Sequence, residues 1–259
     1  MPKDKHSNKK KTNIISMILM CCCIVLLIYS GIKIVVWCMN NKNNKKILDE
    51  ISEFVTVDEK KEDNDDERYA VDFEKLKEKN SDVVAWLKVN GTNIETTVVK
   101  STNNDYYLTH NFNKEYNAAG WIFSDYKNKV DGTDKNLVIY GHNMRDNSMF
   151  GSLKWVINEE WYNNEDNKYI TLVTENGTQI YEVFSVYQIE KEDYYIKTNF
   201  NTEEEFINFV QTIKKRSKKD FNVDVNKEDN ILTLSTCANN NKYRVVLHAK
   251  KKNNSGEIK

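Results

Sequence analysis

The sequence lacks an excess of charge of either sign. Its 38 Lys and Arg residues balance 39 Asp and Glu residues, which gives a formal net charge of −1. No global basic field therefore points to nucleic acid as a partner. Glycine is scarce, at eight residues, and Pro2 is the only proline. We find no internal repeat, no phosphate-cradling glycine loop and no cluster of metal ligands, so we expect no cofactor and no metal.

Cysteine is nearly absent from the part of the chain that follows residue 38. Four of the five cysteines lie in or beside an apolar run near the N-terminus, which leaves Cys237 alone in the remainder. A single thiol cannot form an internal disulfide, and an unpaired cysteine outside the cell is a candidate for a reactive group. A buried, inert cysteine that packs as a small hydrophobe is the alternative. The cysteine count alone does not decide between the two.

A long uncharged run predicts a membrane span. The first thirteen residues hold five lysines and one aspartate, and Ile14–Ile32 then runs without a charge. About twenty residues of helix cross a bilayer core, and Lys33 can reach the headgroups, so we expect a signal anchor over residues 14–36. The basic residues 1–13 predict a cytoplasmic N-terminus and an extracytoplasmic remainder. A cleaved signal peptide fits less well, because its apolar region is shorter and ends in a small-residue site.

Composition divides the rest of the chain. Residues 37–68 are expected to form an extracytoplasmic tether, with a short amphipathic pattern at Ile47 and Ile51 and a strongly acidic run over residues 58–67. The folded domain is predicted over residues 69–252, and residues 253–259 are predicted to be a disordered tail. The tether would hold this domain away from the membrane surface.

The predicted domain is mostly β. A helix is expected over residues 71–79. Asn80 and Ser81 offer a stop for this helix and a new cap for a second helical segment, residues 82–87. Short stretches rich in Val, Ile, Thr and Tyr then favour a closed barrel or a sandwich. The predicted strands are Ile94–Val99, Trp121–Phe123, Leu137–Tyr140, Tyr169–Val173, Gln179–Ile189, Ile231–Ser235 and Tyr243–Ala249.

One clear helix interrupts the predicted strands. Thr202 and Glu205 form a capping box, followed by an apolar stripe at helical spacing. Its basic end, residues 214–219, suits the helix dipole. A solvated helix end is favoured there over a nucleic-acid patch, because no aromatic platform accompanies the charges.

Three polar residues follow or open apolar strands. His142 follows one predicted strand, Cys237 another, and Arg244 stands near the start of a third. A thiol needs a nearby base or cation to become a thiolate, and a histidine can also protonate a departing amine. A guanidinium can stabilise the oxyanion of acyl transfer. His110 and His248 are alternatives to His142, so these residues alone indicate either an exported thiol enzyme or a membrane-tethered binding domain.

The segments around these residues match known signatures. Thr233–Cys237 reads TLSTC, which resembles the sortase signature TLxTC, and Arg244 follows at a tolerated distance. Tyr140–Met144 (YGHNM), with Ser148–Phe150 (SMF) downstream, is similar to the histidine segment of class B sortases. Other similar segments are Val84–Leu87 (VAWL), Gly91–Ile94 (GTNI), Asp105–Leu108 (DYYL) and Ala119–Asp125 (AGWIFSD). The resemblance covers about residues 70–250.

The resemblance implies a fold and a reaction. The fold is an eight-stranded β-barrel with N-terminal helices and a helix inserted before the cysteine strand. The reaction is transpeptidation: Cys237 attacks the threonine carbonyl of a C-terminal sorting signal, and the thioester passes to an amine of a cell-wall precursor. His142 is implied as general acid/base and Arg244 as the oxyanion stabiliser. A thiol peptidase that transfers the acyl group to water is the alternative, because both reactions use the same acyl-enzyme.

The resemblance also implies partners and substrate contacts. Surface proteins with an Asn-Pro-type sorting motif, a peptidoglycan amine and the membrane are the expected partners. Asn239 stands where some relatives carry an acidic residue, and residues 238–242 form a short connection. A pilus-polymerising enzyme is less favoured. The implied peptide-groove residues are Asn104, Leu108, Tyr140, Tyr195, Ile196 and Ser235.

Overall fold

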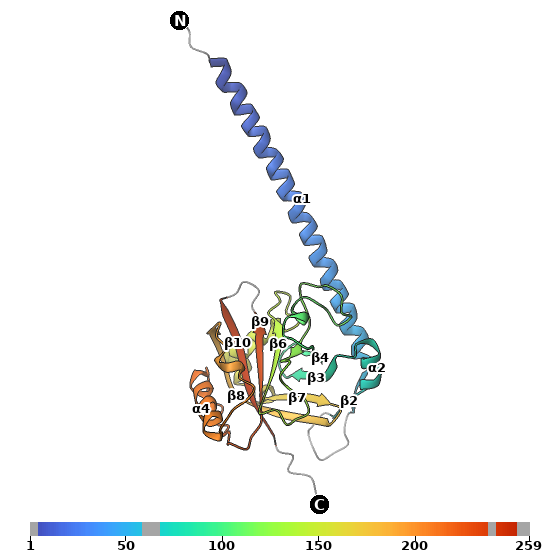
Figure 1. Cartoon of the computed structure of the whole chain (residues 1–259), viewed down its shortest axis with the longest axis vertical. Coiled ribbons are helices and arrows are strands. Elements are labelled where there is room, and N and C mark those ends of the chain that lie inside the picture. Colours follow the sequence, from blue (N-terminus) through green and yellow to red (C-terminus); the bar gives the residue numbers. More distant parts are fainter. Residues whose placement is uncertain (1–4, 59–67, 238–241, 253–259) are drawn as a thin grey trace, which may run out of the picture. The chain divides into compact units, whose positions relative to one another are not determined.

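A computed structural model of the chain describes residues 5–58, 68–237 and 242–252 (Figure 1). The chain divides into two compact units, Met1–Lys45 and Lys46–Lys259. The second unit begins before Tyr69, the predicted start of the folded domain, and Ile47 and Ile51 are buried in its core. Part of the predicted tether is therefore folded. Most of the acidic run and the predicted tail lie outside the described residues.

Helix α1 (Lys5–Ser52) contains the predicted span. From Ile14 onward it is long and apolar enough to cross a membrane by length and composition. Its most apolar window has a mean hydropathy of 2.6, and none of that window is buried within the protein. Exposed apolar side chains on every face are typical of a helix whose solvent is lipid.

A hairpin and a short helix lead into the barrel. Strands β1 (Val55–Asp58) and β2 (Arg68–Val71) pair antiparallel. Helix α2 (Phe73–Lys79) follows, and the Asp72 side chain accepts a hydrogen bond from the Lys75 N–H at 3.0 Å. The helix predicted over residues 71–79 is confirmed from Phe73 onward, since Val71 belongs to β2 and Asp72 is the N-cap.

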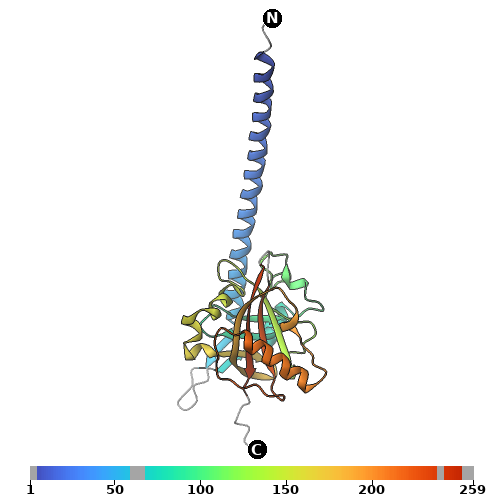
Figure 2. The same cartoon turned by 90° about the vertical axis from the view of Figure 1, so that its left-hand side faces the viewer.

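Eight strands close into a barrel in the order β10-β8-β7-β3-β4-β5-β6-β9 (Figures 1 and 2). This confirms the predicted closed barrel. The strands are β3 (Val83–Val89), β4 (Glu95–Val99), β5 (Phe123–Ser124), β6 (Asn136–His142), β7 (Tyr169–Thr174), β8 (Gly177–Glu190), β9 (Ile231–Cys237) and β10 (Tyr243–Lys251). The short helices between them are η1 (Tyr106–Leu108), η2 (Gly151–Ile157), α3 (Glu159–Tyr162), η3 (Glu165–Lys168) and η4 (Tyr194–Ile196).

The pairing of β6 with β9 is the part of the barrel wall that positions the predicted catalytic residues. These strands run parallel and in register from Asn136 opposite Ile231 to His142 opposite Cys237. All seven residues of β6 are buried, which explains its almost continuous apolar sequence. On its other side β9 pairs antiparallel with β10, so three adjacent strands carry the predicted trio.

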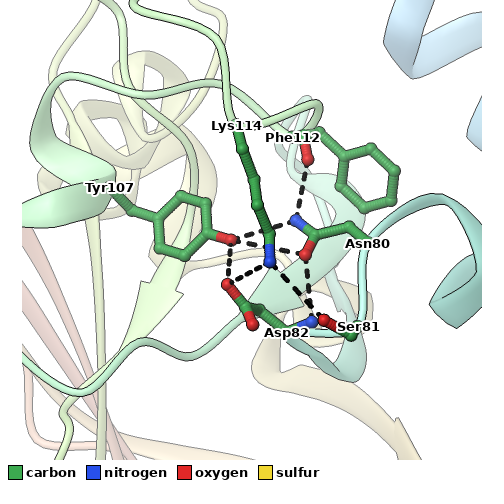
Figure 3. A network of polar contacts seen from close by, with 6 residues as sticks. All are labelled: Asn80, Ser81, Asp82, Tyr107, Phe112 and Lys114. Atoms are coloured by element: carbon green, nitrogen blue, oxygen red, sulfur yellow. Dashed lines mark hydrogen bonds and ion pairs between the residues drawn. The ribbon is translucent and has the colours of Figure 1, made fainter.

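The prediction for residues 82–87 was wrong, because strand β3 occupies this segment. Asn80 does not cap a second helix. Its Oδ1 accepts from the Asp82 N–H at 2.9 Å, and its Nδ2 donates to the Phe112 carbonyl at 2.7 Å (Figure 3). The Tyr107 hydroxyl donates to the Asp82 carboxylate at 2.6 Å in the same network. The contacts of Asn80 with Phe112 and Tyr107 come from distant parts of the chain, so the residues next to Asn80 do not reveal them.

Helix α4 (Glu203–Arg216) is the predicted insertion before the cysteine strand. The Thr202 hydroxyl accepts from the Glu205 N–H at 3.1 Å, as the capping box predicts. The apolar stripe is buried, and the Ser185 hydroxyl of β8 donates to the Ile213 carbonyl at 2.7 Å. Figure 2 shows α4, in orange, lying across the outside of the barrel.

Candidate active site

The three residues predicted to carry chemistry lie at one end of adjacent strands. His142 ends β6 directly opposite Cys237, which ends β9. On β10, Val246 lies opposite Ser235, so continuing this antiparallel register by two residues brings Arg244 to the level of Cys237. Arg244 lies close enough to His142 for its positive charge to lower the pKa of that imidazole. The barrel register thus gathers residues that are far apart in the sequence.

His142 is buried, and its two ring nitrogens have different surroundings. Only 4% of the residue is exposed. Nε2 lies 2.7 Å from the Leu108 carbonyl oxygen, whereas Nδ1 has no hydrogen-bond partner among the described residues. Burial lowers the pKa of His142, and Arg244 acts in the same direction, while the Leu108 carbonyl opposes both. The neutral imidazole, which can accept a proton, is therefore favoured.

Residues 140–150 fix the backbone of His142. The His142 carbonyl accepts hydrogen bonds from the Met144 and Phe150 N–H groups, each at 3.0 Å. The fully buried Phe150 ring covers Gly141, and a Cβ at Gly141 would lie 2.6 Å from that ring. The small residue before His142 and the aromatic residue downstream therefore form one packed unit.

His248 is fully buried at the centre of a chain of hydrogen bonds. The Thr233 hydroxyl donates to Asn136 at 2.7 Å, so it accepts from His248 Nδ1, 2.8 Å away. His248 Nε2 then accepts from the Tyr187 hydroxyl at 2.9 Å. Burial lowers the pKa of His248 to about 3. Both of its nitrogens are occupied, which suits a structural role.

His110, the other alternative, lies beside η1. Its ring stacks on Tyr106, with the ring centroids 4.1 Å apart, and its Nδ1 lies 2.8 Å from the Tyr106 carbonyl oxygen. Of the three histidines, His142 is thus the one that lies directly opposite Cys237 in the barrel register.

Comparison with known proteins decides the family. The sortase domain family matches residues 87–252, well over half of the chain. The chain belongs to the sortase family. It is 37% identical over 227 residues to sortase B of Listeria monocytogenes, an alignment that covers 86% of this chain and 90% of the relative.

Two solved sortase B structures have the same fold as this sortase. Clostridium perfringens sortase B is 40% identical with a TM-score of 0.65, over 70% of this chain and 100% of that one. The Staphylococcus aureus sortase B–substrate complex is 33% identical with a TM-score of 0.66, over 71% of this chain and 85% of that one. The protein is a class B sortase, a cysteine transpeptidase of a cell-surface enzyme family.

The predicted groove residues of this sortase fall into small groups. Tyr195 and Ser235 are buried, and their hydroxyls lie 3.2 Å apart. Ser235 is also paired in register with Tyr140. Ile196 is half-buried beside Tyr195 on η4, and Leu108 is half-buried, with its carbonyl on His142.

The sequence did not predict a role for Asp125, which joins two of the groove residues. Its Oδ2 accepts from the Asn104 Nδ2 and from the Tyr140 hydroxyl, each at 2.9 Å, and its Oδ1 accepts from the Lys127 N–H at 2.9 Å. Asp125 is buried, and its N–H donates to the Val138 carbonyl of β6 at 2.8 Å. The signal in the sequence that could have indicated Asp125 is an acidic residue directly after a short buried strand, β5.

The connection from β9 to β10 includes Asn239, and residues 238–241 lie outside the described residues. Within the described part of the chain, no group of three or more His, Cys, Asp and Glu side chains could hold a metal ion.

Proposed function

We propose that Cys237 is the nucleophile of this transpeptidase, His142 its general acid and base, and Arg244 the cation that stabilises the oxyanion. The observation that carries the assignment is the β6–β9 register, which puts His142 opposite Cys237. The open Nδ1 of His142 supports it, as does the engagement of both His248 nitrogens in hydrogen bonds.

In the first half-reaction His142 accepts the thiol proton of Cys237, and the resulting thiolate attacks the carbonyl carbon of a threonine in the sorting signal. Negative charge forms on the carbonyl oxygen, where the fixed guanidinium of Arg244 stabilises it. The C–N bond then breaks, and His142 donates a proton to the departing amine. The products are a thioester on Cys237 and the released C-terminal peptide.

In the second half-reaction an amine of a peptidoglycan precursor attacks the thioester. The amine loses a proton to His142, the C–S bond breaks, and the surface protein is joined to the acceptor by a new amide. Water in place of the amine would give hydrolysis by the same machinery. A neutral His142, favoured by burial, can accept the amine proton at this step.

The substrate is proposed to be an Asn-Pro-type sorting signal in a groove formed by the six predicted contact residues. Two supports are the Asp125 contacts of Asn104 and Tyr140 and the similarity to a sortase B solved with its substrate. Residues 14–36 are proposed as the membrane anchor, with residues 1–13 in the cytoplasm and the predicted domain, residues 69–252, outside. This orientation would place the thiol beside the wall precursor.

The test uses the full chain in detergent micelles, quenched sorting-signal peptides and a short amine acceptor. Mass spectrometry should find an acyl adduct on Cys237 and a ligated product. Both should vanish in Cys237→Ala, and ligation should fall steeply in His142→Ala. Hydrolysed product alone, with every acceptor tried, would favour the peptidase reaction. An adduct on another residue, or turnover in Cys237→Ala, would overturn the assignment.

A further inference from the structure

The hydrogen bond between His142 and Leu108 determines which ring nitrogen carries a proton. A backbone carbonyl can only accept, so His142 Nε2, 2.7 Å from the Leu108 oxygen, must carry a hydrogen. The other nitrogen, Nδ1, is buried without a partner among the described residues. In the neutral ring, Nδ1 is then the basic nitrogen, and it belongs to the residue opposite Cys237.

Gly120 packs against this carbonyl. Its φ is +57°, and a Cβ there would overlap the Tyr107 carbonyl oxygen and lie 2.9 Å from that of Leu108. The next residue, Trp121, donates its N–H to the Tyr107 carbonyl at 2.9 Å. Any side chain at position 120 would therefore displace the two carbonyls, which suits a backbone position that admits only glycine.

We propose that Gly120 and the Leu108 carbonyl hold His142 as the Nε2–H tautomer, so that Nδ1 is the atom that exchanges protons in the reaction. Both are positioning residues that act through His142. The inference rests on the proposed role of His142 and extends it to a single atom. The opposite tautomer would direct the Nε2 lone pair at the carbonyl oxygen and lose this hydrogen bond.

The same contact also serves the charged ring. When Nδ1 takes a proton, Nε2–H remains on the Leu108 carbonyl, and a hydrogen bond from a cationic donor is stronger than one from a neutral donor. This bond raises the pKa of His142 against the effect of burial. The proton can therefore move on and off Nδ1 without a change of partner at Nε2.

His248 provides an internal reference of the opposite kind. Its Nδ1 donates to Thr233, which itself donates to Asn136, and its Nε2 accepts from Tyr187. His248 is therefore the Nδ1–H tautomer, so the two buried histidines should give opposite patterns in one spectrum.

The first experiment measures the tautomers directly in the full chain, labelled with ¹⁵N-histidine in detergent micelles. Long-range ¹H–¹⁵N spectra at pH 8 should show a protonated Nε2 and an unprotonated Nδ1 for His142, and the reverse for His248. The signals are assigned by their loss in His142→Gln and His248→Gln. An Nδ1–H form of His142 would overturn the proposal. The result does not depend on activity, so it stays separate from the Cys237 adduct test.

The second experiment compares two glycine variants. Gly120→Ala should lower kcat by about 10²-fold through misplacement of the ring, leave the peptide KM nearly unchanged, and produce a tautomer mixture at His142. Gly177→Ala is the matched control, since Gly177 also has a positive φ, +112°, but no atom lies within 4 Å of its added Cβ. Its kcat and tautomers should equal those of the wild type.

A folded Gly120→Ala enzyme with wild-type kcat and a pure Nε2–H signal would refute the role of Gly120. Should this variant fail to fold, the wild-type tautomer measurement still decides the role of the Leu108 carbonyl.

Discussion

At the scale of single residues, Arg244 has two separable effects. Its positive charge lowers the pKa of His142, and its guanidinium is proposed to stabilise the oxyanion. In Arg244→Gln the pKa of His142 should rise, because a cation that disfavours the imidazolium is gone. Transpeptidation should fall by about 10²–10³-fold, as is typical when an oxyanion-stabilising group is removed.

Arg244→Lys separates the two effects. It keeps the charge, so the pKa of His142 should stay near the wild-type value while kcat still falls, since an ammonium cannot reproduce the planar guanidinium contact. An NMR titration of His142 in both variants measures the pKa independently of turnover. An unchanged pKa in Arg244→Gln would show that the charge does not reach the imidazole.

Asp125 offers a second prediction at this scale, on substrate binding. In Asp125→Asn one carboxylate oxygen becomes an NH2 donor, which meets another donor in either orientation: Asn104 Nδ2 and the Tyr140 hydroxyl, or the Lys127 N–H. Asn104 cannot simply turn over, because its Oδ1 already accepts from the Tyr126 N–H at 3.0 Å. We expect the peptide KM to rise several-fold with a smaller change in kcat.

Tyr140→Phe is the matched control for Asp125→Asn, since it removes one of the two donors to Oδ2 and leaves the carboxylate. It should raise KM less than Asp125→Asn does. Equal effects on KM in steady-state assays of the two variants would assign the whole effect to the tyrosine hydroxyl.

At the scale of elements, the sequence predicted every barrel strand except β3. The run Val83–Val89 is short and apolar, a pattern that periodicity cannot separate from a buried helix. Asn80 favoured a helix cap locally, but its side chain binds Phe112, a contact that depends on distant chain. Local chemistry was sufficient for α4, because the Thr202 hydroxyl accepts from the Glu205 N–H and the Glu205 carboxylate accepts from the Asn201 N–H, all within one turn.

The candidate site shows the same division. The positions of His142 and Cys237 at strand ends were predictable, because each ends an apolar strand that its own sequence specifies. Asp125, Gly120 and the Leu108 carbonyl were not, because their roles arise only when β5, η1 and the end of β6 come together. A backbone carbonyl also leaves no mark in the sequence.

The hydrogen-bond chain through β6, β9, β10 and β8 carries a prediction about stability. His248 has a pKa of about 3 in the folded protein and about 6.5 when unfolded. Between these pH values the unfolded state binds a proton that the folded state does not, so stability falls as the pH drops. The contribution of His248 is about 1.4 kcal/mol per pH unit.

Urea unfolding of the full chain at pH 7.5, 6 and 5 tests this through His248→Gln. The variant should be less stable at pH 7.5, by about 1–3 kcal/mol, because Tyr187 and Thr233 lose their partner. Its free energy of unfolding should also depend less on pH than that of the wild type. Parallel pH profiles of the two proteins would show that His248 does not contribute to the acid sensitivity.

At the scale of the whole molecule, the proposed function requires the N-terminus and the catalytic unit to lie on opposite sides of the membrane. Five lysines precede the span, within residues 1–13, and the apolar stretch of α1 begins at Ile14. Because basic flanks stay in the cytoplasm, we predict that the N-terminus is inside and the barrel outside. The thiol would then lie on the outer side of the membrane, where the peptidoglycan precursor presents its amine.

Labelling of single cysteines in intact cells tests this orientation. In a background with Cys237→Ala and serines at the other four cysteines, a membrane-impermeant maleimide should label Glu160→Cys, an exposed position on α3. Ser7→Cys should react only after permeabilisation. Reaction of Ser7→Cys in intact cells would reverse the topology. Its failure to react even in permeabilised cells, with a shortened chain by mass spectrometry, would instead identify a cleaved signal peptide, because cleavage removes residue 7 and with it the membrane anchor.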